Sequence, residues 1–406
     1  MDKHISQGYK DSPLGIIPQE WEVKRLGDIA DITSGTTPLR ANSKYYNNGV
    51  IPWVKTTDLN NGTLYETEEK VSKEAVEKTS LKILPKGTVL VAMYGGFRQI
   101  GRTALLGIDA TINQALSALM CKSSVESPFV LAWLNCRVNY WKRLAASSRK
   151  DPNITGNEVA KFPILIPSKE EQGCIVEVLG LWDTAIEKQL ELIEKLKLRK
   201  RALMQQLLTG KKRLPGFSGE WEEVKLGDVF DERNETNRDD LPLLSITGDK
   251  GVIYQSDSDK RDISNDDKSK YKRICPNDIG YNTMRMWQGR SALSELEGIV
   301  SPAYTIVTSR ESVNVRFMAM LIQQPRVVYD FWTHSQGLVS DTLNCKYPDF
   351  CQVKVRIPTE EEQTAIASVL VKADKEIELA KEKLANLQSQ KRGLMQQLLT
   401  GKKRVV

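Results

Sequence analysis

The chain has 406 residues, 40% of them hydrophobic and 7% aromatic, which is a globular composition in a chain too long for one ordinary core. No apolar run reaches the ~18–20 residues that cross a bilayer, and residues 1–13 lack the apolar middle of a secretion signal. We therefore expect a soluble, cytoplasmic protein of two domains plus connecting elements. The net charge of +6 is compatible with a polyanionic partner but favours nucleic acid only slightly.

The cysteines and histidines give no sign of a metal site. The six cysteines form no CxxC pair, and His4 and His334 are the only histidines, so no zinc-ligand set can be assembled from the spacing. The sequence instead predicts reduced, mostly buried thiols.

Residues 1–165 form the first expected domain. After a loose leader of about 13 residues, short β-branched and apolar runs bounded by Gly, Pro and Asn predict strands at 50–54, 87–93, 101–106 and 116–120. Residues 128–134 are more helix-like, and a polar loop follows at 147–157. The pattern predicts a strand-rich α+β body, which we call the first body.

Residues 166–213 change character and predict one long helix. Pro167 prevents a helix from entering from upstream, and Ser168 with Glu171 forms a capping-box pattern. Apolar residues then recur at the a and d positions of heptads, which we call the seam. The helix is expected to end at Gly210, in the position that closes a helix.

This helix is repeated later in the chain. The stretch KRALMQQLLTGKKR at 200–213 returns at 391–404 with a single change, Ala202 to Gly393, and the IPxxEEQ motif at 166 returns at 357. Residues 357–406 therefore form a second long helix, with Thr359 and Glu362 repeating the capping pattern. Its seam also carries a lysine, Lys391, at the position equivalent to Lys200, which costs stability but can fix register or partner choice. The seam residues are Ile175, Leu179, Trp182, Ile186, Ile193, Leu196, Leu203, Leu207, Ile366, Leu370, Ile377, Leu384, Leu387, Leu394 and Leu398.

Two helices with one heptad stripe each most simply pack on each other. The sequence does not give their orientation, although antiparallel packing is favoured because it places a body at each end. Between the helices, residues 214–356 form a second body that follows the first loosely. Residues 274–284 can be aligned with 83–93, and residues 289–292 with 101–104. The two bodies are therefore expected to share one fold with different surface residues.

No catalytic motif accompanies this architecture. The chain contains no GxGxxG, GxxxxGK[ST], HExxH or GxSxG pattern, and two histidines offer little for acid–base work. Polar residues gather instead in glycine-broken loops after equivalent strands, where Arg can bind guanine, Asn or Gln can bind adenine, and Lys or Ser can fix phosphates. The candidate DNA-binding residues are Tyr94, Arg98, Gln99, Arg102, Arg149 and Lys150 in the first body, and Asn282, Arg285, Trp287, Gln288, Arg290 and Gln336 in the second.

The chain resembles the specificity subunits of Type I restriction–modification systems. The resemblance rests on the EWE…LGD opening of each half, on LPKGTVLVAM at 84–93 and NQALSAL at 113–119, and above all on the duplicated IPxxEEQ helix. It implies two target-recognition domains, each reading one half of a bipartite DNA sequence, and an antiparallel coiled coil that sets the gap between the half-sites. The second half has Ser301-Pro302-Ala303 in place of Asn113-Gln114-Ala115 and departs from the motif there.

The resemblance also implies partners and the absence of cofactors in this chain. Two modification subunits that bind S-adenosylmethionine and methylate adenine dock on the scaffold, and restriction subunits that use ATP and magnesium join them. Two other hypotheses remain from the residues alone. One is a coiled-coil adaptor whose two bodies bind proteins, and the other is a self-contained nuclease or methyltransferase, which the missing motifs disfavour.

Overall fold

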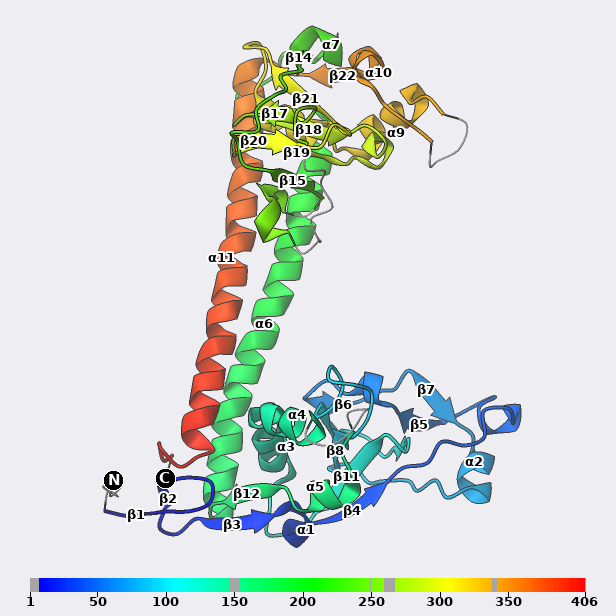
Figure 1. Cartoon of the computed structure of the whole chain (residues 1–406), viewed down its shortest axis with the longest axis vertical. Coiled ribbons are helices and arrows are strands. Elements are labelled where there is room, and N and C mark those ends of the chain that lie inside the picture. Colours follow the sequence, from blue (N-terminus) through cyan, green and yellow to red (C-terminus); the bar gives the residue numbers. More distant parts are fainter. Residues whose placement is uncertain (1–6, 147–152, 249, 259–266, 338–341, 406) are drawn as a thin grey trace. The chain divides into compact units, whose positions relative to one another are not determined.

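The computed structural model describes residues 7–146, 153–248, 250–258, 267–337 and 342–405. The chain divides into two compact units, residues 1–189 with 383–406 and residues 190–382. Each unit combines one body with the start of the long helix that follows that body and with the end of the other long helix (Figure 1).

The first body is built on a five-stranded sheet of order β4-β11-β8-β9-β6. Strand β11 pairs antiparallel with both β4 and β8, and β6 is parallel to β9. A three-stranded sheet of order β10-β5-β7 and the pairs β1-β2 and β3-β12 complete it. The strands are β1 (Tyr9–Lys10), β2 (Ile17–Pro18), β3 (Glu22–Arg25), β4 (Ala30–Ser34), β5 (Ile51–Val54), β6 (Thr63–Leu64), β7 (Glu69–Val71), β8 (Val89–Ala92), β9 (Thr103–Leu106), β10 (Thr111–Ile112), β11 (Leu116–Cys121) and β12 (Pro163–Ile166).

Helices cover the five-stranded sheet and form the main core of this unit with it. Trp141 of α4 stacks on Phe162 with ring centroids 4.0 Å apart, and Trp133 of α3 donates its indole N–H to the Pro163 carbonyl at 3.0 Å. The helices of this body are α1 (Leu26–Ile29), η1 (Ser43–Tyr45), η2 (Thr56–Asp58), α2 (Lys73–Lys78), α3 (Ser127–Cys136), α4 (Val138–Ala146) and α5 (Gly156–Ala160).

The second body repeats the central strands of the first. Its sheet has the order β14-β21-β18-β19, with β21 antiparallel to both β14 and β18. The pairs β13-β22, β15-β16 and β17-β20 surround it. The elements are β13 (Glu222–Lys225), α7 (Leu226–Val229), β14 (Phe230–Arg233), β15 (Leu244–Thr247), β16 (Gly251–Tyr254), η3 (Gln255–Asp257), β17 (Lys272–Ile274), β18 (Asp278–Asn282), η4 (Met286–Gln288), β19 (Ser291–Leu293), β20 (Gly298–Val300), β21 (Tyr304–Ser309), α8 (Val315–Leu321), α9 (Pro325–His334), α10 (Tyr347–Gln352) and β22 (Lys354–Ile357).

The predicted equivalence of the two bodies is confirmed by strand order. The β8–β9 hairpin of the first body corresponds to the β18–β19 hairpin of the second, and the helix pair α3–α4 corresponds to α8–α9. What differs is the material between the shared strands. The first body inserts the β5-β7-β10 sheet, and the second inserts the β15–β16 hairpin and the β17–β20 pair.

The long helices are α6 (Lys169–Leu207) and α11 (Glu360–Leu398), each of 39 residues and therefore roughly 58 Å long. In the first unit, Ile175 and Leu179 of α6 share a core with Leu398 of α11, and Lys391 binds Asp183. The pairing runs antiparallel, because higher numbers on one helix meet lower numbers on the other. In the second unit, Leu207 shares a core with Ile366 and Leu370 in the same antiparallel sense.

Burial along the long helices follows the heptad pattern. The buried apolar residues are Ile175, Leu179, Ile193 and Leu207 in α6, and Ile366, Ala367, Leu370, Ala373, Ile377, Ala380 and Leu398 in α11; of these, Ala367 alone lies outside the heptad positions. The remaining predicted seam residues are half-buried, namely Trp182, Ile186, Leu196, Leu203, Leu384, Leu387 and Leu394. The two seam lysines each meet an aspartate of the other helix, Lys200 with Asp374 at 2.5 Å and Lys391 with Asp183.

Three local expectations need correction. The capping box at Ser168 is only half formed, because Ser168 Oγ accepts the Glu171 N–H at 3.2 Å while the Glu171 carboxylate binds other groups. Within the described part of the leader the chain is not loose, since β1 pairs with β2 and Tyr9 donates to the Gly401 carbonyl at 3.1 Å. All six thiols are free as expected, but only Cys345 is fully buried, and burial raises its pKa to about 12.

The predicted glycine stops are present. Gly210 and Gly401 adopt φ values of +69° and +70°, and each donates its N–H back to the last residue of the helix. Among the described residues, none of the helices combines the length and the apolar character required to cross a membrane.

Candidate nucleic-acid interface

The loop between β18 and β19, residues 283–290, carries most of the candidate residues of the second body. Asn282 shapes its start, because its side-chain oxygen accepts the Met284 N–H at 3.0 Å. Gly289 ends it with φ +72°, and a Cβ there would lie 3.0 Å from Val328 of α9. A side chain at this position would therefore be strained by the backbone and crowded by the helix. Gly289 therefore allows the loop to pack closely against α9.

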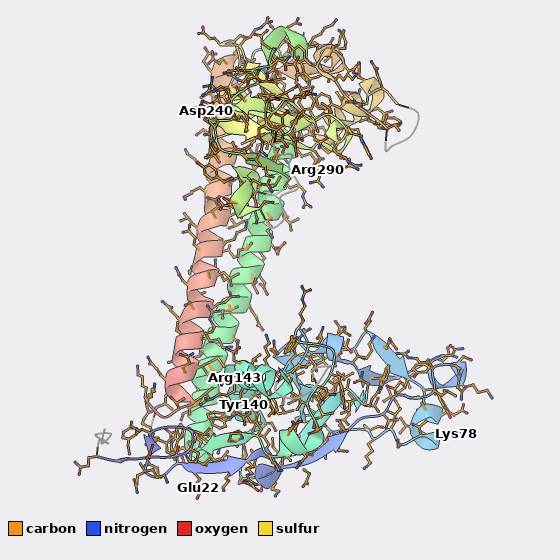
Figure 2. All side chains as sticks on the ribbon, in the orientation of Figure 1. Glu22, Lys78, Tyr140, Arg143, Asp240 and Arg290 are labelled. Atoms are coloured by element: carbon orange, nitrogen blue, oxygen red, sulfur yellow. The ribbon has the colours of Figure 1, made fainter. Side chains whose placement is uncertain are left out.

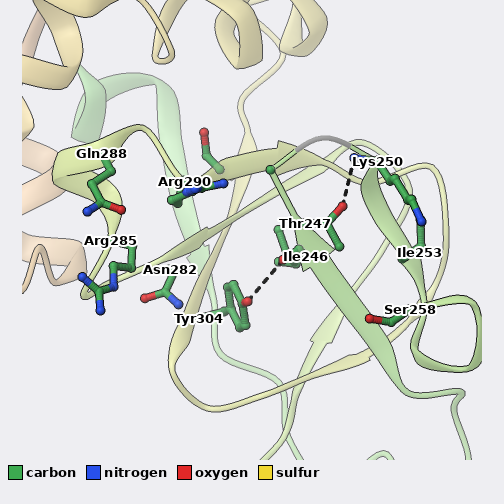
Figure 3. A pocket seen from close by; sticks show the side chains of 12 residues that line it. Ile246, Thr247, Lys250, Ile253, Ser258, Asn282, Arg285, Gln288, Arg290 and Tyr304 are labelled. Carbon is green, nitrogen blue, oxygen red and sulfur yellow. Dashed lines mark hydrogen bonds between the residues drawn. The ribbon is translucent and has the colours of Figure 1, made fainter. Parts of the chain in front are cut away.

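This loop and the β15–β16 hairpin enclose a cavity of about 520 Å³, which we call the hairpin cavity. Figure 3 shows Arg285 and Gln288 on one side of it and Lys250 on the opposite side. The residues that line it are Ile246, Thr247, Gly248, Lys250, Ile253, Ser258, Asn282, Arg285, Gln288, Arg290, Ser291 and Tyr304. None of these described lining residues is acidic, so the cavity presents positive charge and hydrogen-bond donors.

Arg285 and Arg290 differ from the other arginines of this body. Within the part of the chain that the structure describes, neither guanidinium forms an ion pair or a side-chain hydrogen bond. Six others bind carboxylates, namely Arg233, Arg238, Arg273, Arg310, Arg316 and Arg326. Two exposed, uncompensated cations on one cavity are suited to an anionic or acceptor-rich ligand.

The hairpin side of the cavity was not identified from the sequence. Tyr304 donates its hydroxyl hydrogen to the Ile246 carbonyl at 3.3 Å, and Thr247 donates to the Gly251 carbonyl at 3.0 Å. Ser291 is 6% exposed, and its Oγ has no hydrogen-bond partner among the described atoms. Ser291 directly follows Arg290, whereas Thr247 and Tyr304 lie on distant segments that the strand pairing brings to the loop.

The structure separates the remaining candidates of the second body from this cavity. Trp287 donates its indole N–H to the Met284 carbonyl at 3.1 Å and stiffens the loop from within. Gln336 lies beyond α9, where its side chain donates to Asp349 at 2.9 Å. Four of the six candidates, Asn282, Arg285, Gln288 and Arg290, therefore line one cavity, and two do not.

The first body presents an equivalent loop, residues 93–102, between β8 and β9. Gly101 ends it with φ +76°, and a Cβ there would lie 2.9 Å from Trp141 of α4. Gly101 thus packs against α4 as Gly289 packs against α9. Tyr94 is 42% exposed and Arg98 is exposed beside it. The two bodies thus hold the same loop in place by the same device.

Arg102 of the first body is held by its own domain. Its guanidinium donates to Gln99 at 2.9 Å and to the Leu59 carbonyl. Tyr94 and Arg98 are the predicted residues whose side chains face outward there. Arg149 and Lys150 lie outside the described residues. Figure 2 labels Arg143 on α4 of the first body and Arg290 at the end of the 283–290 loop of the second body.

A second polar arrangement lies at the start of each long helix and explains the IPxxEEQ motif. In the first unit, Arg404 binds the Glu171 carboxylate with Nε at 2.5 Å and Nη2 at 2.9 Å, and Trp21 donates its indole N–H to the same carboxylate at 2.9 Å. In the second unit, Arg213 binds Glu362 in the same bidentate way at 2.6 and 2.5 Å. The last arginine of each repeat is thus a clamp on a buried glutamate.

The glutamine of the motif fixes the helix to its body. Gln172 donates to the Pro167 carbonyl at 3.0 Å and accepts the Glu126 N–H at 2.9 Å. Gln363 repeats both bonds, with the Pro358 carbonyl and the Asn314 N–H, each at 2.9 Å. These buried polar side chains are fully used by the scaffold, and the described residues include no cluster of three or more His, Cys, Asp or Glu suited to a metal ion.

Comparison with known proteins relates the chain to one family. Residues 18–198 match the model of the Type I restriction modification DNA specificity domain. The chain is 32% identical over 198 residues to the MjaIX specificity subunit of Methanocaldococcus jannaschii, covering 47% of this chain and 45% of that protein. The EcoR124I/EcoR124II specificity subunit of Escherichia coli is 26% identical over 43% of this chain and 44% of its own length. The chain thus aligns with somewhat less than half the length of these two relatives.

Other similarities extend over the whole chain. The putative MjaX specificity subunit of M. jannaschii is 24% identical over 98% of this chain and 97% of its own length. A solved structure described as the basis of assembly and conformational transition of the type I R-M system has a TM-score of 0.62 at 17% identity, covering 95% of this chain and 99% of its own. The S subunit from M. genitalium has a TM-score of 0.52 at 14% identity, covering 93% and 96%. At these identities the structures show a shared fold.

Proposed function

Because residues 18–198 match the model of the Type I restriction modification DNA specificity domain, we propose that this chain selects the DNA target of a Type I restriction–modification complex. Each body reads one half of a bipartite sequence, and the long helices set the separation of the half-sites. The observation that carries this proposal is the duplication itself. The two bodies share one strand order, and in each the loop of the equivalent hairpin contains a glycine that packs against a helix.

The chain acts in this proposal as a scaffold without catalysis of its own. Two modification subunits bound to S-adenosylmethionine methylate adenines in the selected site, and restriction subunits supply cleavage with ATP and magnesium. The complex works on DNA in the cytoplasm. The repeated helix ends offer two equivalent positions for equivalent partners, because Arg213 with Glu362 and Arg404 with Glu171 form the same clamp in each unit.

Methylation mapping tests the target-selecting role. We expect cells that express the modification subunit with this chain to acquire a split adenine-methylated motif that cells with the modification subunit alone lack. Replacing residues 214–356 by the second body of a relative with another target should change one half of that motif and leave the other half and the spacer. A genome without any split motif, or a replacement that alters both halves, contradicts the proposal.

The salt dependence of binding separates this role from that of a protein-binding adaptor. Phosphate contacts release counterions, so DNA affinity should fall steeply between ~50 and 200 mM salt. An adaptor would show no such affinity for DNA. The unpaired arginines of the hairpin cavity favour the DNA-binding role.

A further inference from the structure

We propose that the hairpin cavity is a phosphate clamp that receives one backbone phosphodiester of the DNA, so that Arg285 and Arg290 position the second body and do not read a base. The inference rests on the proposed function and deepens it. It assigns the two arginines a role that is independent of sequence and leaves base reading in this body to other side chains.

The first step is the balance of donors and acceptors in the cavity. Arg285 and Arg290 bring unpaired guanidinium groups, and the buried Ser291 hydroxyl has no partner among the described atoms. The acceptor of Asn282 is already occupied by the Met284 N–H at 3.0 Å. The described lining therefore demands a ligand with several acceptor atoms and negative charge, which a phosphodiester supplies.

The second step is electrostatic. Two like charges that share a cavity repel each other, and an anion bound between them removes this repulsion. Six other arginines of this body obtain the same relief from neighbouring carboxylates, as Arg316 does from Glu295 at 3.1 Å. Arg285 and Arg290 have no such carboxylate among the described residues, so the compensating anion is expected from the ligand.

The third step is shape. The site is a concavity with Ser291 buried in its wall, so the ligand has to project into it. Phosphates project from the outside of a duplex, whereas the guanine edge that arginine reads lies inside a major groove about 8.5 Å deep. An exposed arginine pair beside this concavity therefore suits a projecting phosphate better than a base edge.

Gly248 positions Arg290. A Cβ at Gly248 would collide with the Arg290 guanidinium, so the absence of a side chain on the hairpin allows this group to lie against the hairpin backbone. Figure 3 shows Arg290 directed from the loop towards the β15–β16 hairpin. Substituting Gly248 should therefore displace one cation of the clamp without removing its charge.

The experiment uses the full chain co-expressed with its modification subunits. DNA affinity is measured over a salt series on a duplex that carries the mapped motif and on a scrambled duplex. We expect Arg285→Gln and Arg290→Gln to weaken binding to both duplexes by a similar factor. Each should make the slope of log affinity against log salt shallower by about 0.9, the value for one lost phosphate contact. The methylated motif should stay the same.

Three matched variants sharpen the result. Arg316→Gln removes the same charge from an arginine paired with Glu295 outside the cavity, and should leave the slope unchanged. Ser291→Ala should weaken binding roughly ten-fold or more without changing the slope, because a neutral hydroxyl that donates to the charged phosphate is lost. Gly248→Ala should reproduce the weaker binding of Arg290→Gln although the net charge is retained.

Other outcomes overturn the proposal. If either arginine variant relaxes one position of the methylated motif at an unchanged slope, that arginine reads a base. If slope, affinity and motif all stay the same, the cavity does not contact DNA. If 20 mM inorganic phosphate at matched ionic strength raises the Tm of the wild type but not of Arg290→Gln while DNA binding is unaffected, the clamp serves free phosphate. The proposed function fails separately, because then the wild type itself produces no motif.

Discussion

A buried glutamate and a distant arginine explain the strongest sequence signal of this chain at the scale of single residues. The final arginine of each repeat, Arg213 or Arg404, lies beyond the helix stop and binds the glutamate that begins the other long helix. The side chains of Glu171 and Glu362 are each 1% exposed. The IPxxEEQ motif supplies the glutamate of this contact and the end of the KRxLMQQLLTGKKR repeat supplies the arginine. This accounts for the duplication of both segments together.

Substituting Arg404 tests this contact. Arg404→Gln leaves the buried Glu171 carboxylate with Trp21 as its remaining described donor, and should lower the free energy of unfolding by roughly 1–3 kcal/mol. Urea unfolding followed by tryptophan fluorescence measures the change. Lys403→Gln removes the same charge from an exposed neighbour and should have little effect. If Arg404→Gln lowers the free energy of unfolding no more than Lys403→Gln does, the contact between Arg404 and Glu171 adds no stability.

Single residues also show where sequence reasoning stops in the candidate site. Arg285 and Arg290 were found because they follow a predicted strand in a glycine-broken loop, which is a local pattern. Ser291 directly follows Arg290 but was not singled out, because its burial without a hydrogen-bond partner cannot be seen in the sequence. Tyr304 reaches the cavity through the pairing of β21 with β18, which the sequence does not reveal. Gln336 was included because it lies in a polar loop next to Gly337, and the structure shows its side chain bound to Asp349.

At the scale of elements, the long helices were the most predictable part. Heptad spacing, Pro167 and the two glycine stops each act on residues close to them in the sequence. These signals can therefore be interpreted without tertiary information. The capping box was overestimated for the opposite reason, because Trp21 and Arg404 compete for Glu171 from distant parts of the chain. The body strands were located approximately and the two halves were recognised as equivalent, but the order of the strands in each sheet was not predicted, because it depends on pairing between distant segments.

The ion pair between a seam lysine of one long helix and an aspartate of the other can be tested by charge reversal. Lys200 meets Asp374, and both are partly exposed at 25% and 44%, so the pair is expected to contribute about 0.5 kcal/mol. Lys200→Glu and Asp374→Lys each create a like-charge pair and should lower the urea midpoint, and the double variant should recover most of the loss.

The control is a matched cycle on Lys195 and Glu191, which lie on one helix and 4.0 Å apart. Reversing them should leave the association of α6 with α11 unchanged. If the stability lost in the double variant of Lys200 and Asp374 equals or exceeds the sum of the losses in the two single variants, the pair does not set the register.

At the scale of the whole molecule, the proposed role of the two long helices in setting the spacing of the half-sites can be tested. Both are 39 residues long, and the contact of Asp183 with Lys391 gives their local antiparallel register. By that register, the bond between Glu187 and Lys188 faces the bond between Asn386 and Leu387. A heptad inserted at both bonds preserves the seam on each helix and lengthens each by roughly 10 Å.

We expect the double insertion to lengthen the unread spacer of the methylated motif by about three base pairs, since duplex DNA rises 3.4 Å per pair, and to leave both half-sites unchanged. Methylation mapping reads half-sites and spacer together, so a changed half-site would reveal a disturbed body. Seven residues inserted in the 214–219 linker serve as the length control and should not alter the spacer, because this segment precedes the second body and lies outside both helices. A double insertion that still methylates the original spacer would mean that the helices hold the bodies without measuring the distance between half-sites.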